Sequence, residues 1–150
     1  MSVHSYSRCW LLLVWGTLTR EKALGTDARV KVARFLLEYA HSKNILLRSV
    51  FVNSDHVHAL IDLPTGVTIE ESVQLLKGAS SHWINQNSVV AAKFSWGRGY
   101  GAFSVSESNL SRIVEYIAGQ DEHHRVKSFQ EEYAGFLRAV GIQPNEAENR

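Results

Sequence analysis

The chain has 150 residues, of which 45% are hydrophobic and 21% are charged, and its net charge at pH 7 is +1. This composition is that of an ordinary globular domain, and the charge neither indicates nor excludes a nucleic-acid partner. The apolar run from Trp10 to Trp15 is shorter than the ~20 residues of a membrane span, and the single Cys9 excludes an internal disulfide. We therefore expect a cytoplasmic protein that is not embedded in a membrane. We expect a single domain over residues 1–140 and a polar tail over residues 141–150.

The N-terminal half of the chain has the pattern of one strand, one helix and two further strands. The predicted strands cover residues 10–18, Ile45–Val52 and His56–Leu63. Thr26 is a candidate N-cap for a helix over residues 27–42. The apolar residues expected on the buried face of this helix are Val30, Ala33, Leu36, Leu37 and Ala40.

The C-terminal half begins with a capping box, formed by Thr68 and Glu71, that starts a second long helix. The residues of this helix that repeat at helical spacing are Ile69, Val73, Leu76, Ser80, Trp83 and Ile84. A glycine-rich segment over residues 96–101 leads into a fourth strand over Ala102–Ser106. Ser108 or Asn109 then caps a helix over residues 110–122, and a last helix is indicated by Phe129, Tyr133, Phe136 and Leu137.

The predicted elements follow the order βαββαβ and are followed by two helices. This order predicts an α+β fold of the ferredoxin-like kind, a sandwich with an antiparallel sheet, with an addition at its C-terminal end. Many enzymes and binding modules share this scaffold, so the function has to be inferred from individual side chains.

Two histidines separated by one residue, His56 and His58, form the first candidate site. On a strand they point to the same face and can bind one metal ion. An isolated pair of this kind is also common among sheet histidines that bind no metal. We expect the pair on a sheet surface, where replacing either histidine would cost little stability.

A polar stripe on the predicted helix over residues 110–122 forms the second candidate site. At helical spacing it contains Arg112, Tyr116, Gln120 and His123, beside an apolar stripe that includes Ile117. A solvated helix face with a half-buried tyrosine is the alternative interpretation.

The two sites occur together with further motifs that cover nearly the whole chain. These motifs are Asn53–Ile61, Leu75–Gly78, Trp96, Gly99–Ser106, Tyr116-Ile117 with Gln120, His123-His124 and Ser128–Tyr133. In combination they resemble the single-tyrosine HUH transposases of bacterial insertion sequences, the IS200-like family with its REP-associated relatives.

The resemblance implies a role for each matching residue. His56 and His58 would bind a divalent metal ion, Mg²⁺ or Mn²⁺, with Gln120 as a further ligand. Tyr116, on the C-terminal helix, would be the catalytic nucleophile. The implied reaction is the cleavage and rejoining of single-stranded DNA through a 5′-phosphotyrosine, at hairpins that mark the ends of a mobile element. The implied assembly is a homodimer in which His56 and His58 of one subunit share a site with Tyr116 of the other.

Further residues of suitable chemistry are expected to contact the DNA. The basic and aromatic candidates are Lys77, Arg98, Tyr100, Arg112, His123 and His124. A solvated surface position is the alternative for each of them. Trp96 is expected either in the core or as a platform for a DNA base, whereas Trp83 and Tyr39 are expected in the core.

Two other functions compete with the transposase hypothesis. Arg98–Phe103 nearly matches the start of an RNA-recognition signature, but Ala102 replaces a required aromatic residue. A small zinc hydrolase could use His56 and His58 with either His123 or His124. Neither alternative gives a role to Tyr116.

Overall fold

A computed structural model describes residues 6–119 and residue 131 of the chain. The chain divides into two compact units, Met1–Ile117 and Ala118–Arg150, and the fold set out below is that of the first. The predicted last helix, the tail and the boundary at residue 140 lie outside the described residues. The extent of the domain therefore stays a prediction.

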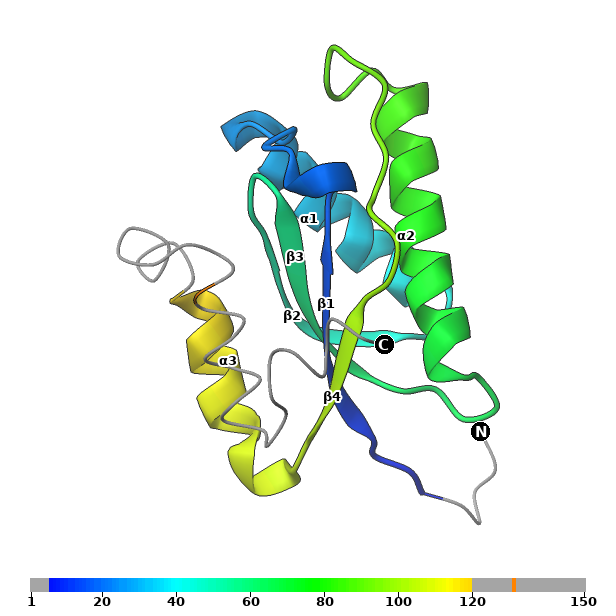
Figure 1. Ribbon diagram of the computed structural model, residues 1–150. Coiled ribbons are helices and arrows are strands. Elements are labelled where there is room, and N and C mark those ends of the chain that lie inside the picture. The colour runs from blue at the N-terminus through cyan, green and yellow to red at the C-terminus, as the bar shows by residue number, and fades with distance from the viewer. Residues whose placement is uncertain (1–5, 120–130, 132–150) are drawn as a thin grey trace. The chain divides into compact units, whose positions relative to one another are not determined.

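The first unit contains four strands and three α-helices in its described part (Figure 1). In chain order the elements are β1 (Trp10–Gly16), the 3₁₀ turn η1 (Leu18–Arg20), α1 (Thr26–Ser42), β2 (Leu46–Val52), β3 (His56–Asp62), α2 (Ile69–Gln86), β4 (Gly101–Val105), the 3₁₀ turn η2 (Glu107–Asn109) and α3 (Leu110–Ala118). The strands form one sheet in the order β2-β3-β1-β4, and every neighbouring pair is antiparallel. This topology confirms the predicted α+β, ferredoxin-like βαββαβ fold with an added C-terminal helix.

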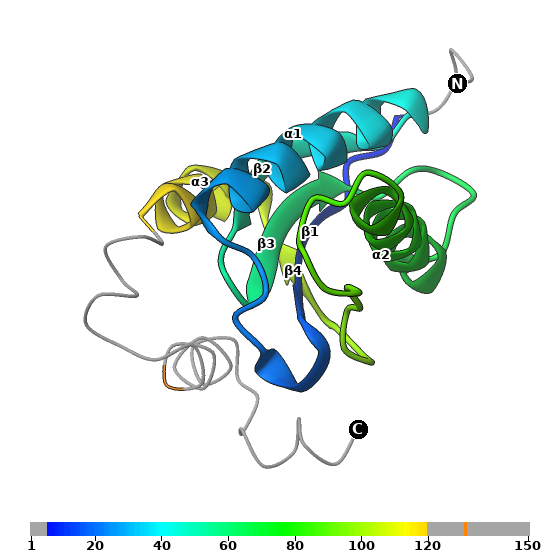
Figure 2. The ribbon, with the colours of Figure 1, turned by 90° about the horizontal axis from the view of Figure 1, so that it is seen from above.

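The main core lies between the sheet and the two long helices, α1 and α2 (Figure 2). Side chains alternate along a strand, so every second residue of β1 and β3 faces these helices. The residues of β1 and β3 in this core are Leu11, Leu13, Trp15, Val57, Ala59 and Ile61, and the helix residues include Val32, Leu36, Val73 and Leu76. The intervening residues of β1 and β3 point to the opposite face.

The buried face of α1 agrees only in part with the predicted one, because Leu36 and Ala40 are buried as predicted and Ala33 is partly buried against the core. The residues that are buried are Ala28, Val32, Leu36 and Ala40, which follow an i, i+4 spacing. Val30 is 57% exposed and Leu37 is 45% exposed. These two apolar residues lie off the buried stripe, because each residue turns the helix by about 100°. Apolar character alone therefore selected the wrong face for Val30 and Leu37.

Helix α2 begins as the sequence predicts. The Thr68 hydroxyl accepts a hydrogen bond from the Glu71 N–H at 3.0 Å, which satisfies one of the free donors at the helix start. Its predicted face is largely confirmed, with Val73, Leu76 and Ile84 buried in the core.

Helix α3 is shorter than predicted in its described part. It ends at Ala118, and Gly119 forms a turn. A glycine has no Cβ atom and costs about 1 kcal/mol of helix stability relative to alanine, so it favours this end. The predicted cap residues Ser108 and Asn109 lie in η2, immediately before the helix. No helix among the described residues is long and apolar enough to span a membrane.

Candidate active site

The two histidines of β3 lie on the face of the sheet that points away from α1 and α2. They alternate with Val57 and Ala59, which belong to the main core. His56 is 0% exposed and His58 is 4% exposed. The expectation of a sheet surface was therefore wrong for both side chains, and the cause is that this second face is covered as well.

The second face is covered in part by α3. Ile117 of this helix is 1% exposed, and Leu12, Leu60 and Phe103 of the sheet are buried on the same face. The indole Nε1 of Trp10 donates a hydrogen bond to a carboxylate oxygen of Glu107 at 2.6 Å. The turn that precedes α3 is thereby tied to β1, so α3 starts at a defined place beside the sheet.

Tyr116 of α3 lies against His58. The centroids of the two rings are 5.9 Å apart, and the ring planes meet at 80°. The ring of His58 in turn meets that of His56 edge to face, with centroids 5.0 Å apart. The structure thus brings together three of the predicted site residues within one chain.

Asp55 orients the imidazole of His56, a role that sequence analysis missed. Its Oδ1 lies 2.7 Å from Nδ1 of His56. An ionised carboxylate can only accept a hydrogen bond, so Nδ1 donates and the neutral ring keeps its lone pair on Nε2. Carboxylates commonly fix metal-binding histidines in this way. The adjacent residues Asp55 and His56 could have suggested the contact, but Asp55 lies in the turn before β3, where the sequence does not fix the direction of a side chain.

The residues present fit a divalent metal ion. Two imidazoles converge from one strand, and the tautomer of His56 presents a lone pair for coordination. Over the described residues, no group of three or more His, Cys, Asp or Glu side chains forms a complete cage. The remaining ligands must then come from other groups, as is usual for Mg²⁺, which keeps water and phosphate oxygens. The predicted ligand Gln120 lies outside the described residues.

Lys77 has a structural role that its sequence context did not indicate. Its ammonium group donates hydrogen bonds to the carbonyl oxygens of Gly97 at 2.8 Å and Gly99 at 3.0 Å. Burial lowers the pKa of this amine below its usual value. Lys77 thereby fixes the glycine-rich segment to α2. Its predicted phosphate contact stays a prediction.

The glycine-rich segment continues the sheet at the end of β1 that lies beside the histidines. The Gly97 N–H donates to the carbonyl oxygen of Gly16 at 2.8 Å. A Cβ atom at residue 97 would lie 3.1 Å from the carbonyl oxygen of Thr17, so glycine permits this close approach. The predicted DNA contacts Arg98 and Tyr100 follow in this segment, and both are exposed.

The other candidates are distributed as follows. Arg112 is exposed on α3, one turn before Tyr116. Trp96 is half-buried and packs against the core, where its Nε1 donates to the Ser80 hydroxyl at 2.9 Å and its ring contacts Trp15, which favours the core position over that of a platform for a base. His123 and His124 lie outside the described residues.

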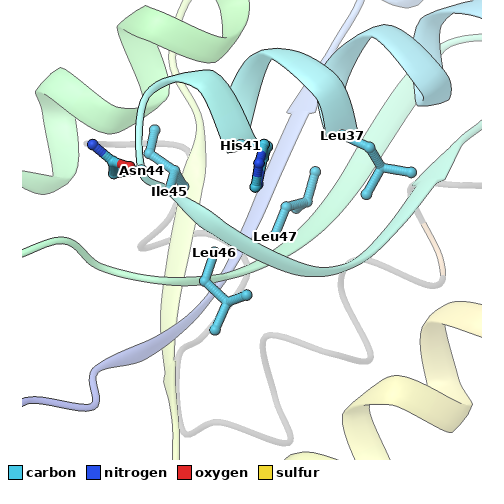
Figure 3. Close-up of a pocket in the computed structure, with 6 residues that line it drawn as sticks. All are labelled: Leu37, His41, Asn44, Ile45, Leu46 and Leu47. Carbon is cyan, nitrogen blue, oxygen red and sulfur yellow. The ribbon is translucent and has the colours of Figure 1, made fainter.

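A separate apolar pocket lies at the opposite end of the sheet (Figure 3). The residues that line it are Leu37, His41, Asn44, Ile45, Leu46 and Leu47. Leu46 pairs with Asp62 at the far end of β3, whereas the β2 residue Phe51 pairs with His58. The pocket is therefore distinct from the site that contains the histidines.

Comparison with known proteins gives consistent matches. Residues 5–120 match the family model described as "Transposase IS200 like". The transposases for insertion sequence element IS200 from Salmonella typhimurium and Salmonella typhi are each 26% identical over 128 residues, which cover 82% of this chain and 84% of each relative.

Two solved structures share the fold. The crystal structure of a transposase candidate from Deinococcus radiodurans R1 has a TM-score of 0.60 and 24% identity, covering 80% of this chain and 96% of that one. A REP-associated tyrosine transposase bound to a REP hairpin has a TM-score of 0.58 and 15% identity, covering 83% of this chain and 74% of that one.

Proposed function

The chain belongs to the IS200-like transposase family, and on that premise we propose that it cuts and rejoins single-stranded DNA with Tyr116 as the nucleophile. Membership of this family makes the chain an enzyme of DNA transposition. It also decides against the RNA-recognition and zinc-hydrolase hypotheses. The observation that carries the mechanistic proposal is the contact of the Tyr116 ring with His58.

The proposed reaction is a transfer of one phosphodiester from DNA to the enzyme. The phenol of Tyr116 loses its proton and its oxygen attacks the scissile phosphorus, the bond to the 3′ oxygen breaks, and that oxygen takes up a proton. The 5′-phosphotyrosine linkage is itself a phosphodiester, so the reaction exchanges one phosphodiester for another. A 3′ hydroxyl can therefore reverse the step and rejoin DNA without a nucleotide cofactor.

His56 and His58 are the proposed ligands of a divalent metal ion, Mg²⁺ or Mn²⁺, with Gln120 as a third. When bound, such an ion would polarise the phosphate and offset the charge of the transition state. The contribution of the protein is to hold the imidazoles in place. Asp55 does so through its 2.7 Å contact with His56, and both imidazole rings are buried.

We propose that the substrate is a DNA strand that contains a hairpin. Supporting this, a relative of the same fold has been solved with a REP hairpin bound. Arg98 and Tyr100 are exposed beside the end of β1, and Arg112 is exposed on α3. Arginine can pair with phosphate oxygens and tyrosine can stack on an unpaired base. His123 and His124 are proposed as further contacts, and the cytoplasm is the proposed location.

The proposed assembly is a homodimer with exchanged helices. In it, His56 and His58 of one subunit would meet Tyr116 of the partner subunit, in place of the contact within one chain. A two-fold dimer would supply two nucleophiles, one for each DNA end.

The proposal is tested by incubating the protein and Mg²⁺ with a labelled single strand and then denaturing the mixture. We expect a labelled band that migrates with the protein and disappears after digestion with protease. Free DNA fragments without an adduct would indicate a hydrolase. An intact strand under all metal conditions would contradict any cleavage function.

A further inference from the structure

The strand end that carries His56 lies beside a glycine of the neighbouring strand. In the antiparallel pairing of β1 with β3, Gly16 lies directly opposite His56. Opposite residues of such a pair direct their side chains to the same face, with Cβ atoms about 4.5–5.5 Å apart. The space that a side chain at residue 16 would occupy is therefore next to the imidazole of His56, on the face that α3 covers.

The side chain of Arg20 lies in this space. A Cβ atom added to Gly16 would be 3.1 Å from both Cδ and Nε of Arg20, and 3.3 Å from the carbonyl oxygen of Asp55. The missing side chain at residue 16 thus leaves room for Arg20 beside the candidate metal site. Arg20 as a whole is exposed, so a ligand can approach it from solvent.

The backbone of η1 has an uncommon conformation at Arg20 and at the residue before it. Thr19 and Arg20 have φ angles of 54° and 57°, in the left-handed region that residues with a Cβ atom rarely adopt. The turn is held by hydrogen bonds from the Thr17 N–H to the Asp55 carbonyl at 2.8 Å and from the Thr17 hydroxyl to the Glu21 carbonyl at 2.6 Å. Such strained backbone persists where the surroundings fix it, and it is concentrated at functional sites.

We infer that Arg20 is a phosphate-binding residue of the active site and that its guanidinium contacts the DNA phosphate that is cleaved. This inference rests on the proposed function. A guanidinium is always charged, and its planar donors match two oxygens of a phosphate. Beside His56 it offsets the negative charge that develops while the phosphorus passes from the 3′ oxygen to the phenol of Tyr116.

The competing explanation is that Arg20 only packs over Gly16 and stabilises the turn. A phosphate contact and a packing contact differ in three measurable ways. The phosphate contact contributes to the salt dependence of DNA binding, it affects cleavage at saturating DNA, and an added guanidinium ion can replace it. A packing contact changes the melting temperature without these effects.

The experiment compares wild type with Arg20→Ala, Arg20→Lys and the control Arg34→Ala, which removes an exposed arginine of α1. We expect Arg20→Ala to slow adduct formation at saturating DNA by about 10- to 100-fold, the effect of losing one hydrogen bond to a charged group. The slope of log affinity against log salt should fall by about 0.7, one phosphate contact on a single strand. Added guanidinium should restore part of the rate, Arg20→Lys should be intermediate, and Arg34→Ala should behave as wild type.

An unchanged salt slope in Arg20→Ala, with slow cleavage that guanidinium does not restore, would overturn the inference. If wild type itself forms no adduct, the proposed function fails instead. In that case the salt slope alone still decides whether Arg20 binds a phosphate.

Discussion

The phenol of Tyr116 and the imidazole of His58 meet edge to face, with ring centroids 5.9 Å apart, although they belong to a peripheral helix and a central strand. The contact places the candidate nucleophile next to a candidate metal ligand. If His56 and His58 hold a metal ion, it would supply positive charge beside the ring of the proposed nucleophile.

Replacing Tyr116 with phenylalanine should abolish the covalent adduct while leaving fold and DNA binding in place. The change removes only the attacking oxygen and keeps the ring that packs on His58. Adduct formation is measured on denaturing gels, and binding is measured by a shift assay. Tyr100→Phe, a change at an exposed tyrosine, is the matched control and should still form adduct. Adduct formed by Tyr116→Phe would show that another side chain is the nucleophile.

Replacing either metal-site histidine with alanine should abolish metal-dependent cleavage and also reduce stability. Because His56 and His58 are buried, each change leaves a cavity, and we expect a loss of roughly 1–3 kcal/mol in the free energy of unfolding. This revises the expectation of little loss. Denaturant unfolding and calorimetric Mn²⁺ binding measure the two effects. The exposed His82→Ala should change neither, and full Mn²⁺ affinity in His56→Ala would contradict the assignment.

Asp55→Ala should weaken metal binding by about 10- to 100-fold, because the imidazole of His56 loses the carboxylate that fixes its tautomer. Cleavage measured against Mn²⁺ concentration should show a higher half-saturation point and a similar maximum rate. A lower maximum with unchanged metal dependence would mean that Asp55 acts elsewhere in the reaction.

Lys77→Met should destabilise the protein by about 1–3 kcal/mol, since two carbonyl groups lose a charged donor while the aliphatic stem is kept.

The pKa of Lys77 is lowered in the folded state, so the unfolded chain binds more protons as the pH approaches the usual lysine range. The stability contribution of this group therefore rises with pH in that range. This rise of the free energy of unfolding with pH should be absent in Lys77→Met and present in the exposed control Lys93→Met. Equal slopes in both variants would contradict the assignment.

Mixing inactive Tyr116→Phe protein with inactive His56→Ala protein tests the proposed exchange of helices. If sites form across subunits, a mixed dimer holds one intact site, and activity should return to about half per dimer. The measurement is adduct formation after conditions that allow subunits to exchange. A mixture that stays inactive would show that each chain completes its own site.

The fold could be predicted because the spacing of hydrophobic residues agrees with the observed strands and helices along most of the described chain. The order of the strands and helices that the structure describes and the Thr68 cap were correct. The predicted Thr26 cap was wrong, because Gly25 is the N-cap of α1 and Thr26 is its first helical residue. The face of α1 was predicted less well, because Val30 and Leu37 are apolar yet exposed. The spacing of apolar residues identifies the buried face of a helix only when those residues are confined to one stripe.

The candidate site was predicted in composition but not in environment. Spacing placed His56 and His58 on one face of a strand, yet it could not show that α3 covers that face. The contacts of Asp55 and Arg20 depend on turn geometry that no local pattern encodes. Lys77 has the chemistry of a phosphate ligand, and only the fold reveals that it binds two carbonyl groups.

The central position of β3 and the peripheral position of α3 imply two different free energies of local opening within the candidate site. Amide groups of β3 are hydrogen-bonded on both sides, to β1 and β2, and both faces of the strand are buried. Among the described residues of α3, only Ile117 is buried. Hydrogen exchange should therefore be slowest around the histidines and much faster in α3. On the proposed function, Tyr116 could then move away to admit or release a DNA strand while the strand that carries the proposed metal ligands keeps its geometry.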